Sequence, residues 1–243
     1  MKISTKLREL VIKITGYWIF KQKDIPIGCD LINDLKSKIN LPINIVFDVG
    51  ANVGQTAIKF NYYFERATIY SFEPVEKTFN KLLHNTKYTP QVKSYQSALG
   101  DKVDSLSIKI HNDELSVLNS LKKEAQNNYN EQSETINVIT GDIFCEENKI
   151  KEIDLLKIDT EGYELEVLNG FKNMIQKSRI KAIYCEVGFG SSNTRNTYIG
   201  DVLEFANQNN FRFYGLYEVS NLQIKKGSNY GNVLLLSNDF LNK

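Results

Sequence analysis

From residue 43 onward, apolar runs of strand length alternate with segments of helical periodicity, and this alternation constrains the fold most. Strands that alternate with helices form a parallel sheet, which the helices cover on both faces. The sequence therefore predicts an α/β fold. The expected strands are 43–49, 68–72, 92–99, 136–139, 153–158, 180–187, 211–217 and 233–236, and the expected helices are 55–63, 76–85, 163–175 and 198–207.

Three segments depart from this alternation. Residues 105–110 alternate apolar and polar side chains after a Gly100-Asp101 turn, which predicts a local antiparallel hairpin. Residues 112–134 are polar and rich in Asn, Glu and Gln, so we expect a mobile loop or lid there. The last two strands are joined by turn-forming residues without a helical pattern, which predicts an antiparallel pair at the sheet edge.

The N-terminal residues 1–42 are interpreted as a helical extension of a domain formed by 43–243. Residues 2–15 have the pattern of a basic amphipathic helix, and a second helix is expected over 29–38. The first helix could pack on the domain or on a second subunit, as in a homodimer. It could also lie on an anionic membrane surface through residues 2–20. Packing is favoured because only one turn of the helix is distinctly basic.

Composition excludes several functional classes. The chain has 30 basic and 29 acidic residues, so no strong field favours nucleic acid as a partner. Its apolar runs are shorter than the roughly 18 residues of a membrane-spanning helix, and no signal peptide is evident. The three cysteines are scattered without metal-ligand spacing. We expect a cytoplasmic protein, with the inner membrane surface as the alternative location, and no metal site.

A glycine-containing loop follows the first predicted strand. Its sequence is Asp48-Val49-Gly50-Ala51-Asn52-Val53-Gly54, and glycines at such a turn let the backbone approach a ligand closely. The Asp48 carboxylate suits an ammonium or another hydrogen-bond donor and would repel a pyrophosphate. The loop therefore favours a neutral or cationic nucleoside over NAD.

An acidic residue ends the second predicted strand, about twenty residues beyond the loop. Glu73 could accept hydrogen bonds from both hydroxyls of a ribose at this edge of the sheet. The alternative is that Glu73 only caps the helix expected from residue 76.

Charged residues also gather at the ends of two later strands. Lys157 lies within an apolar run, so it should reach a carboxylate, a carbonyl or water beyond the sheet end. Asp159 and Glu161 follow at that strand's carboxyl end, and Glu186 ends the next strand. Such carboxylates suit hydrogen bonding to a substrate hydroxyl, general-base work or a divalent cation. The competing interpretation is helix N-capping by Thr160, with Glu161 and Glu164 favoured by the helix dipole.

Together these motifs resemble the FkbM family of S-adenosylmethionine-dependent methyltransferases, over roughly residues 25–237. The resemblance implies a seven-strand, mostly parallel, Rossmann-like methyltransferase sheet with helices on both faces and an antiparallel C-terminal strand. It further implies O-methylation of a sugar or polyketide hydroxyl, as in polysaccharide biosynthesis, with a small-molecule or glycan acceptor. The matching residues are 48–54, 72–74, 85, 98–101, 156–164, 168–170 and 186.

The resemblance also implies roles for individual residues. Asp159 would lie beside the sulfonium and the acceptor, and our hypothesis is that Asp159 or Glu186, with Glu161 close by, takes the proton of the acceptor hydroxyl. A nicotinamide-dependent oxidoreductase is the alternative, although Gly-x-Gly-x-x-Gly is missing; a cofactor-binding module without turnover is another. The implied cofactor contacts are Asp48, Gly50, Asn52 and Gly54 around the methionine part, Glu73 at the ribose, and Ser97 and Ala98 beside the adenine.

Overall fold

The computed structural model describes residues 5–17, 19–110, 132–190, 195–220 and 228–242. The chain divides into two compact units, Met1–Leu41 and Pro42–Lys243. The predicted division into a helical extension, 1–42, and a methyltransferase domain, 43–243, stays a prediction. Most of the expected loop over 112–134 lies outside the described residues. No helix within the described ranges is long and apolar enough to cross a membrane.

The first unit contains short helices. The segment expected as one helix over 29–38 begins after Asp30, whose side chain accepts a hydrogen bond from the Asn33 N–H at 3.0 Å. Within it, the buried Asp34 pairs with Lys38 at 2.6 Å. The helical segments of this unit are α1 Thr5–Thr15, the 3-10 turn η1 Gln22–Asp24, α2 Leu31–Asn33 and its continuation as the π-turn η2 Asp34–Lys38.

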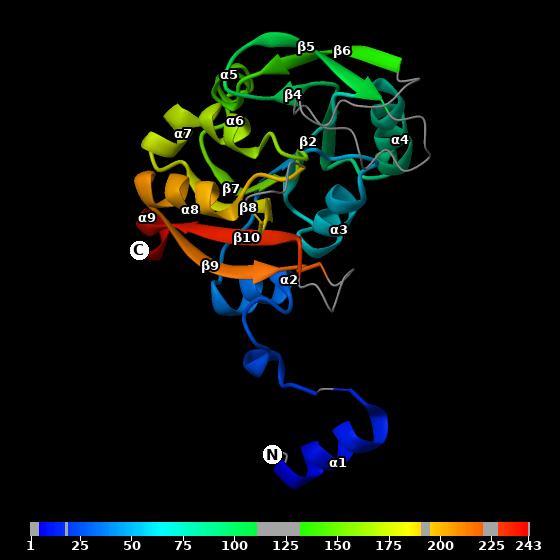
Figure 1. The fold of residues 1–243 in the computed structure, drawn as a ribbon, viewed down its shortest axis with the longest axis vertical. Coiled ribbons are helices and arrows are strands. Elements are labelled where there is room, and N and C mark those ends of the chain that lie inside the picture. The colour runs from blue at the N-terminus through cyan, green and yellow to red at the C-terminus, as the bar shows by residue number, and fades with distance from the viewer. Residues whose placement is uncertain (1–4, 18, 111–131, 191–194, 221–227, 243) are drawn as a thin grey trace. The chain divides into compact units, whose positions relative to one another are not determined.

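The second unit is built on a seven-stranded sheet with the order β3-β2-β1-β7-β8-β10-β9 (Figure 1). The first five strands in this order, from β3 through β1 to β8, run parallel to one another. Strand β10 runs antiparallel to both β8 and β9. This confirms the predicted fold class and the late antiparallel pair. The strands are β1 Ile45–Val49, β2 Thr68–Phe72, β3 Val92–Tyr95, β7 Ile153–Ile158, β8 Ile180–Gly188, β9 Phe211–Tyr217 and β10 Tyr230–Ser237.

Helices cover the sheet on both sides, because its central strands are apolar on both faces. Figure 1 shows α3 and α4 on one side and α6, α7 and α8 on the other. The largest buried cluster joins Phe47 and Phe72 of the sheet to Phe144, Phe171 and residues of α6 to α8. The helices of this unit are α3 Gln55–Tyr63, α4 Glu76–Thr86, α5 Gly141–Glu147, α6 Glu164–Asn169, α7 Lys172–Gln176, α8 Ile199–Gln208 and α9 Asn238–Leu241.

The predicted strand 92–99 and the predicted hairpin after it are wrong in detail. Only Val92–Tyr95 joins the main sheet as β3, while Ala98–Leu99 forms β4 of a second sheet with the order β4-β6-β5. In that sheet β5, Asp104–Ile110, pairs antiparallel with β6, Gln132–Ile139, and not with the preceding strand. The partner of β5 therefore comes from beyond residues 111–131, which local alternation could not indicate.

The predicted helix 163–175 is also wrong in its continuity, because it is broken at Gly170. A Cβ at Gly170 would lie 2.1 Å from the carbonyl oxygen of Gly100, so the backbone after β4 passes directly against the break. Helix α5 was not predicted. It begins after Thr140, whose hydroxyl accepts the Ile143 N–H at 3.1 Å.

Candidate active site

A cavity opens at the carboxyl ends of β1, β2 and β7, the edge where open parallel sheets bind ligands. The loops after these three strands supply its polar lining, and β4 and β5 of the small sheet close one side with apolar residues. The lining residues are Val49, Gly50, Asn52, Gln55, Phe72, Glu73, Pro74, Val75, Ala98, Leu99, Ile108, Asp159, Thr160 and Glu161.

Gly50 brings the loops after β1 and β7 into close contact. Its φ is +74°, and a Cβ there would lie 1.8 Å from the carbonyl oxygen of Asp159. Its N–H donates to the Phe72 carbonyl at 3.0 Å, so the same residue also touches the end of β2. Only glycine fits this position, since any side chain would push the strand ends apart.

Glu73 is a buried carboxylate at the edge of the cavity, with 7% of its surface exposed. One oxygen accepts the Asn52 N–H at 3.1 Å and the other accepts the Val75 N–H at 3.0 Å. Burial raises its pKa to about 7, against these two hydrogen bonds and the nearby Lys157, which lower it. Because Val75 immediately precedes α4, the bond to Val75 also satisfies a helix-end donor, so the capping and ligand-binding interpretations are compatible.

Lys157 is a buried cation beneath the contact between Gly50 and Asp159. Its Nζ lies 3.0 Å from Asp48 Oδ1 and 3.6 Å from Asp159 Oδ2, and it donates to the Gly50 carbonyl at 3.0 Å. Burial alone would lower the pKa of Lys157, but Asp48 and Asp159 raise it above its ordinary value. The prediction that Lys157 reaches a carboxylate or a carbonyl is thus confirmed on both counts. The fully buried Asp48 faces this lysine and is not among the cavity-lining residues.

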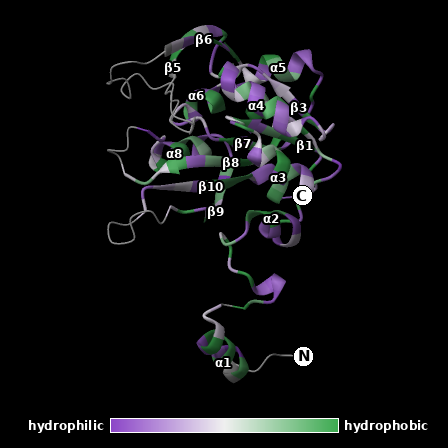
Figure 2. Cartoon of the chain, turned by 90° about the vertical axis from the view of Figure 1, so that its right-hand side faces the viewer, coloured by the Kyte–Doolittle hydropathy of each residue, from purple (hydrophilic) through white to green (hydrophobic). Residues whose placement is uncertain are grey.

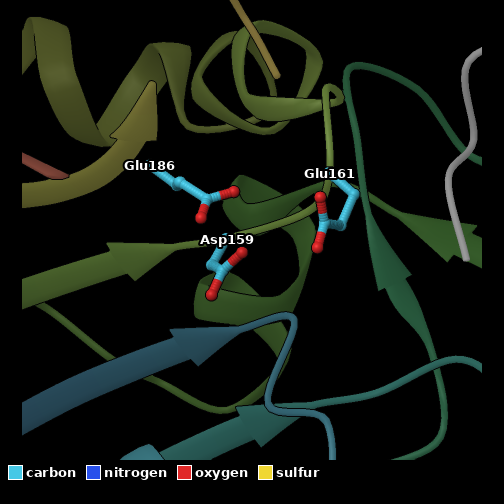
Figure 3. A group of neighbouring side chains, drawn as sticks. All are labelled: Asp159, Glu161 and Glu186. Atoms are coloured by element: carbon cyan, nitrogen blue, oxygen red, sulfur yellow. The ribbon is translucent and has the colours of Figure 1, made fainter. Parts of the chain in front are cut away.

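Three carboxylates converge where β7 and β8 end: Asp159, Glu161 and Glu186 (Figure 3). One oxygen of each lies within 4.8 Å of the others. Glu161 has a φ of +54°, costly for a residue with a side chain, and Arg195 donates to both of its oxygens. The spacing would suit a divalent cation, but acidic groups gather without metals too, and the absence of a metal stays a prediction.

Glu186 has a strongly raised pKa. Burial and the negative charges of Asp159, Glu161 and Glu164 together raise its pKa to about 9, although the Arg195 guanidinium lowers it. Asn196 donates to Glu186 Oε2 at 2.5 Å. At neutral pH Glu186 is therefore a neutral carboxylic acid. Burial also raises the pKa of Glu161, although the Arg195 guanidinium opposes that shift.

Glu164 holds the loop that carries two of these carboxylates. It is fully buried, and its Oε1 accepts the N–H groups of Thr160 and Gly162, each at 3.0 Å. Its Oε2 accepts hydrogen bonds from Thr197, on the segment after β8. Glu164 therefore has a structural role at the start of α6, but the predicted N-cap Thr160 is wrong, because Tyr163 is the residue that precedes this helix.

The structure brings together most but not all of the predicted site residues. Gly54 serves packing instead: its φ is +92°, and a Cβ there would lie 2.7 Å from Leu82 Cδ1 of α4. Arg195 and Asn196 were not predicted. Their only sequence signal was that they follow the predicted strand in which Glu186 lies. The predicted residues that line the cavity are Gly50, Asn52, Glu73, Ala98, Asp159 and Glu161, and those that do not are Asp48, Gly54, Ser97 and Glu186.

Comparisons with known proteins relate the chain to methyltransferases. The sequence model of the family described as "Methyltransferase FkbM domain" matches residues 48–213. The hexuronic acid methyltransferase AglP of Haloferax volcanii is 28% identical over 146 residues, which cover 60% of this chain and 57% of that protein. Methyltransferase 1 of Beauveria bassiana is 28% identical over 147 residues, covering 52% of this chain and 58% of that protein. The chain therefore aligns with somewhat over half the length of these two relatives.

Among solved structures, the crystal structure of Methyltransferase FkbM from Methylobacillus flagellatus is similar with a TM-score of 0.50 and 15% identity. The similarity covers 79% of this chain and 44% of that one. At this identity the likeness concerns the fold. It supports the α/β methyltransferase fold described above.

Proposed function

Because the chain belongs to the FkbM methyltransferase domain family, we propose that it is an S-adenosylmethionine-dependent O-methyltransferase. The observation that carries the proposal is the cavity in which the buried Glu73 and the half-exposed Asp159 lie after β2 and β7, the two strands that flank β1. One carboxylate is suited to a ribose and the other to a reacting hydroxyl.

The lining of the cavity fits this cofactor. Gly50 lines the cavity and lets the loop after β7 approach it closely, and Asn52 belongs to the same loop as Gly50. Glu73 has lone pairs left for two ribose hydroxyls after accepting one N–H on each oxygen. The wall that would bury the adenine is apolar and consists of Phe72, Pro74, Val75, Ala98, Leu99 and Ile108.

The chain's own residues would position the acceptor and take its proton. S-adenosylmethionine, when bound, supplies a methyl group already activated by its sulfonium. We assign the general base to Asp159, which lines the cavity and has 38% of its side chain exposed. Glu186 is protonated at neutral pH and does not line the cavity, so it suits hydrogen-bond donation better than proton abstraction. Arg195 fixes Glu161 at the rim.

For the acceptor we propose a sugar hydroxyl in a glycan or similar glycoconjugate. The support is the relative described as a hexuronic acid methyltransferase, which matches 60% of this chain. A sugar hydroxyl is a weak nucleophile and needs a carboxylate within hydrogen-bond reach, which Asp159 provides.

Calorimetric titration tests the cofactor. The purified chain should bind S-adenosylhomocysteine and should not bind NAD under the same conditions. Binding of NAD without S-adenosylhomocysteine would overturn the proposal in favour of a nicotinamide-dependent enzyme.

A screen for S-adenosylhomocysteine release tests the reaction. Nucleotide sugars, uronic-acid-containing saccharides, neutral saccharides and lipid-linked oligosaccharides would be offered with S-adenosylmethionine, and at least one sugar class should stimulate release. Tight cofactor binding with no release above the acceptor-free rate for any class would instead favour a cofactor-binding module without turnover.

A further inference from the structure

Helix α1 presents an apolar face that is exposed. Leu7, Leu10 and Ile14 are 50%, 52% and 74% exposed. At about 100° per residue these three side chains and the half-buried Val11 fall within one apolar stripe. Figure 2 shows hydrophobic and hydrophilic residues side by side around this helix.

The apolar surface continues past the end of α1. Tyr17, Ile19 and Phe20 are 75%, 48% and 39% exposed. Ile19 and Phe20 line a hollow with Leu7 and Val11 of the helix, so the two segments share one surface. Large exposed apolar side chains gathered in this way mark an interaction surface.

Basic residues border this apolar face. On the helical projection Arg8 and Lys13 lie on opposite sides of the stripe, and Glu9 lies away from it. Residues 1–24 contain six basic and two acidic residues, a net charge of +4, whereas the whole chain carries +1. The positive charge is therefore concentrated in this segment, since residues 25–243 carry a net charge of −3.

We infer that α1 and residues 19–21 dock on an anionic lipid surface, with the helix lying in the plane of the headgroups. The apolar stripe enters the acyl boundary, while Arg8 and Lys13 reach the headgroups from either side. Pairing of two copies through this face would bring two segments of +4 together, so charge favours the lipid over a second copy. This inference does not rest on the methyltransferase proposal.

Vesicle co-sedimentation of the full chain tests the inference. We expect binding to phosphatidylcholine vesicles that contain phosphatidylglycerol, weaker binding at high salt, and little binding to phosphatidylcholine alone. The double variant Arg8→Glu/Lys13→Glu should reduce binding about tenfold or more. Leu10→Glu/Ile14→Glu should abolish binding, because it places charge in the apolar stripe.

A matched control is Lys172→Glu/Lys177→Glu, which makes the same charge change at exposed positions of α7 and its end. It should leave vesicle binding unchanged. Equal loss in the control variant would mean that net charge, not this surface, drives binding. Absence of vesicle binding together with a dimer that Leu10→Glu/Ile14→Glu dissociates, seen by analytical ultracentrifugation, would overturn the inference in favour of a second copy.

Discussion

At the scale of single residues, the site depends on charges that burial would normally remove. Lys157 is 4% exposed, yet it stays charged because Asp48 and Asp159 face it. For Glu73 and Glu186, burial outweighs the hydrogen bonds and positive charges that favour the ionised carboxylate, so the pKa of each is raised. At neutral pH Glu186 therefore holds a proton while Glu73 titrates close to that pH, which gives these two carboxylates different chemical capacities.

Cofactor binding should depend on pH through Glu73. Its pKa of about 7 means that the ionised form, which accepts ribose hydroxyls, is lost as the pH falls below about 7. Calorimetry should show the affinity for S-adenosylhomocysteine falling up to about tenfold per pH unit below that point. Glu73→Gln should bind weakly without this pH dependence, and the exposed Glu76→Gln should behave like the wild type. A wild-type affinity that stays constant between about pH 5 and pH 8 would contradict this role.

Removing the buried lysine should be costly for folding. Lys157→Met leaves Asp48 buried without its counterion, and breaking such a pair destabilises by about 3–5 kcal/mol. The control is Lys102→Met, which removes an exposed ion pair with Asp104 and should leave stability nearly unchanged. Urea unfolding followed by circular dichroism measures both variants. Similar losses for the two would show that Lys157 does not carry the stabilising charge that we assign to it.

At the scale of elements, the site is assembled by the ends of strands that are far apart in sequence. Strands β1 and β7 pair in register from Val46 to Val49, so the loop after each emerges at the same height. Gly50 and Asp159 then meet directly, and the Asp159 N–H donates to the Val49 carbonyl at 3.0 Å. The geometry of this contact fixes where the Asp159 carboxylate lies.

Gly50→Ala tests this contact. Both the positive φ and the 1.8 Å approach to the Asp159 carbonyl oppose a Cβ, so we expect a loss of at least about 2–3 kcal/mol in stability and loss of cofactor binding. Gly16→Ala isolates the cost of positive φ, because its φ is +72° and nothing lies within 4 Å of the added Cβ. That control should lose only about 1 kcal/mol. Equal losses in the two variants would rule out a steric requirement at Gly50.

Elements with strong local signals were predictable from the sequence, and those set by distant contacts were not. Helix α3 was predicted with its observed bounds because Gly54 marks its start and a short apolar pattern follows. The break at Gly170 depends on the backbone of Gly100, seventy positions earlier, which no local pattern shows. For the same reason the partner of β5 was misassigned.

The candidate site was predictable where chemistry follows directly from strand ends. Glu73, Asp159 and Glu161 line the cavity as their positions after strands suggested. The pairing of charges was harder to predict, because the sequence could not show that the cation facing Asp48 is Lys157. Arg195, which holds Glu161, comes from a loop whose course depends on tertiary structure.

At the scale of the whole molecule, the acidic cluster links stability to pH. Glu186 has a folded pKa of about 9 against an ordinary value of 4.5, so the folded state keeps a proton that the unfolded chain releases. Stability should therefore fall as the pH rises between these two values, by up to about 1.4 kcal/mol per pH unit from this group.

Glu186→Gln should remove this part of the pH dependence. Between about pH 7.5 and pH 8.5 Glu73 is mostly ionised and is the same in both proteins, so the difference in slope between variant and wild type reports Glu186. Urea unfolding across this range should show a shallower decline for the variant. Identical slopes would mean that Glu186 is not held protonated in the folded protein.

The central claim is that this chain transfers a methyl group at the cavity beside Asp159. The most direct test is the turnover of Asp159→Asn with saturating acceptor and S-adenosylmethionine, compared with the wild type and with Glu186→Gln. We predict that Asp159→Asn lowers kcat by about 10²–10⁴-fold while its affinity for S-adenosylhomocysteine stays within about twofold, and that Glu186→Gln retains substantial turnover. Full turnover in Asp159→Asn, with Glu186→Gln inactive, would contradict the account.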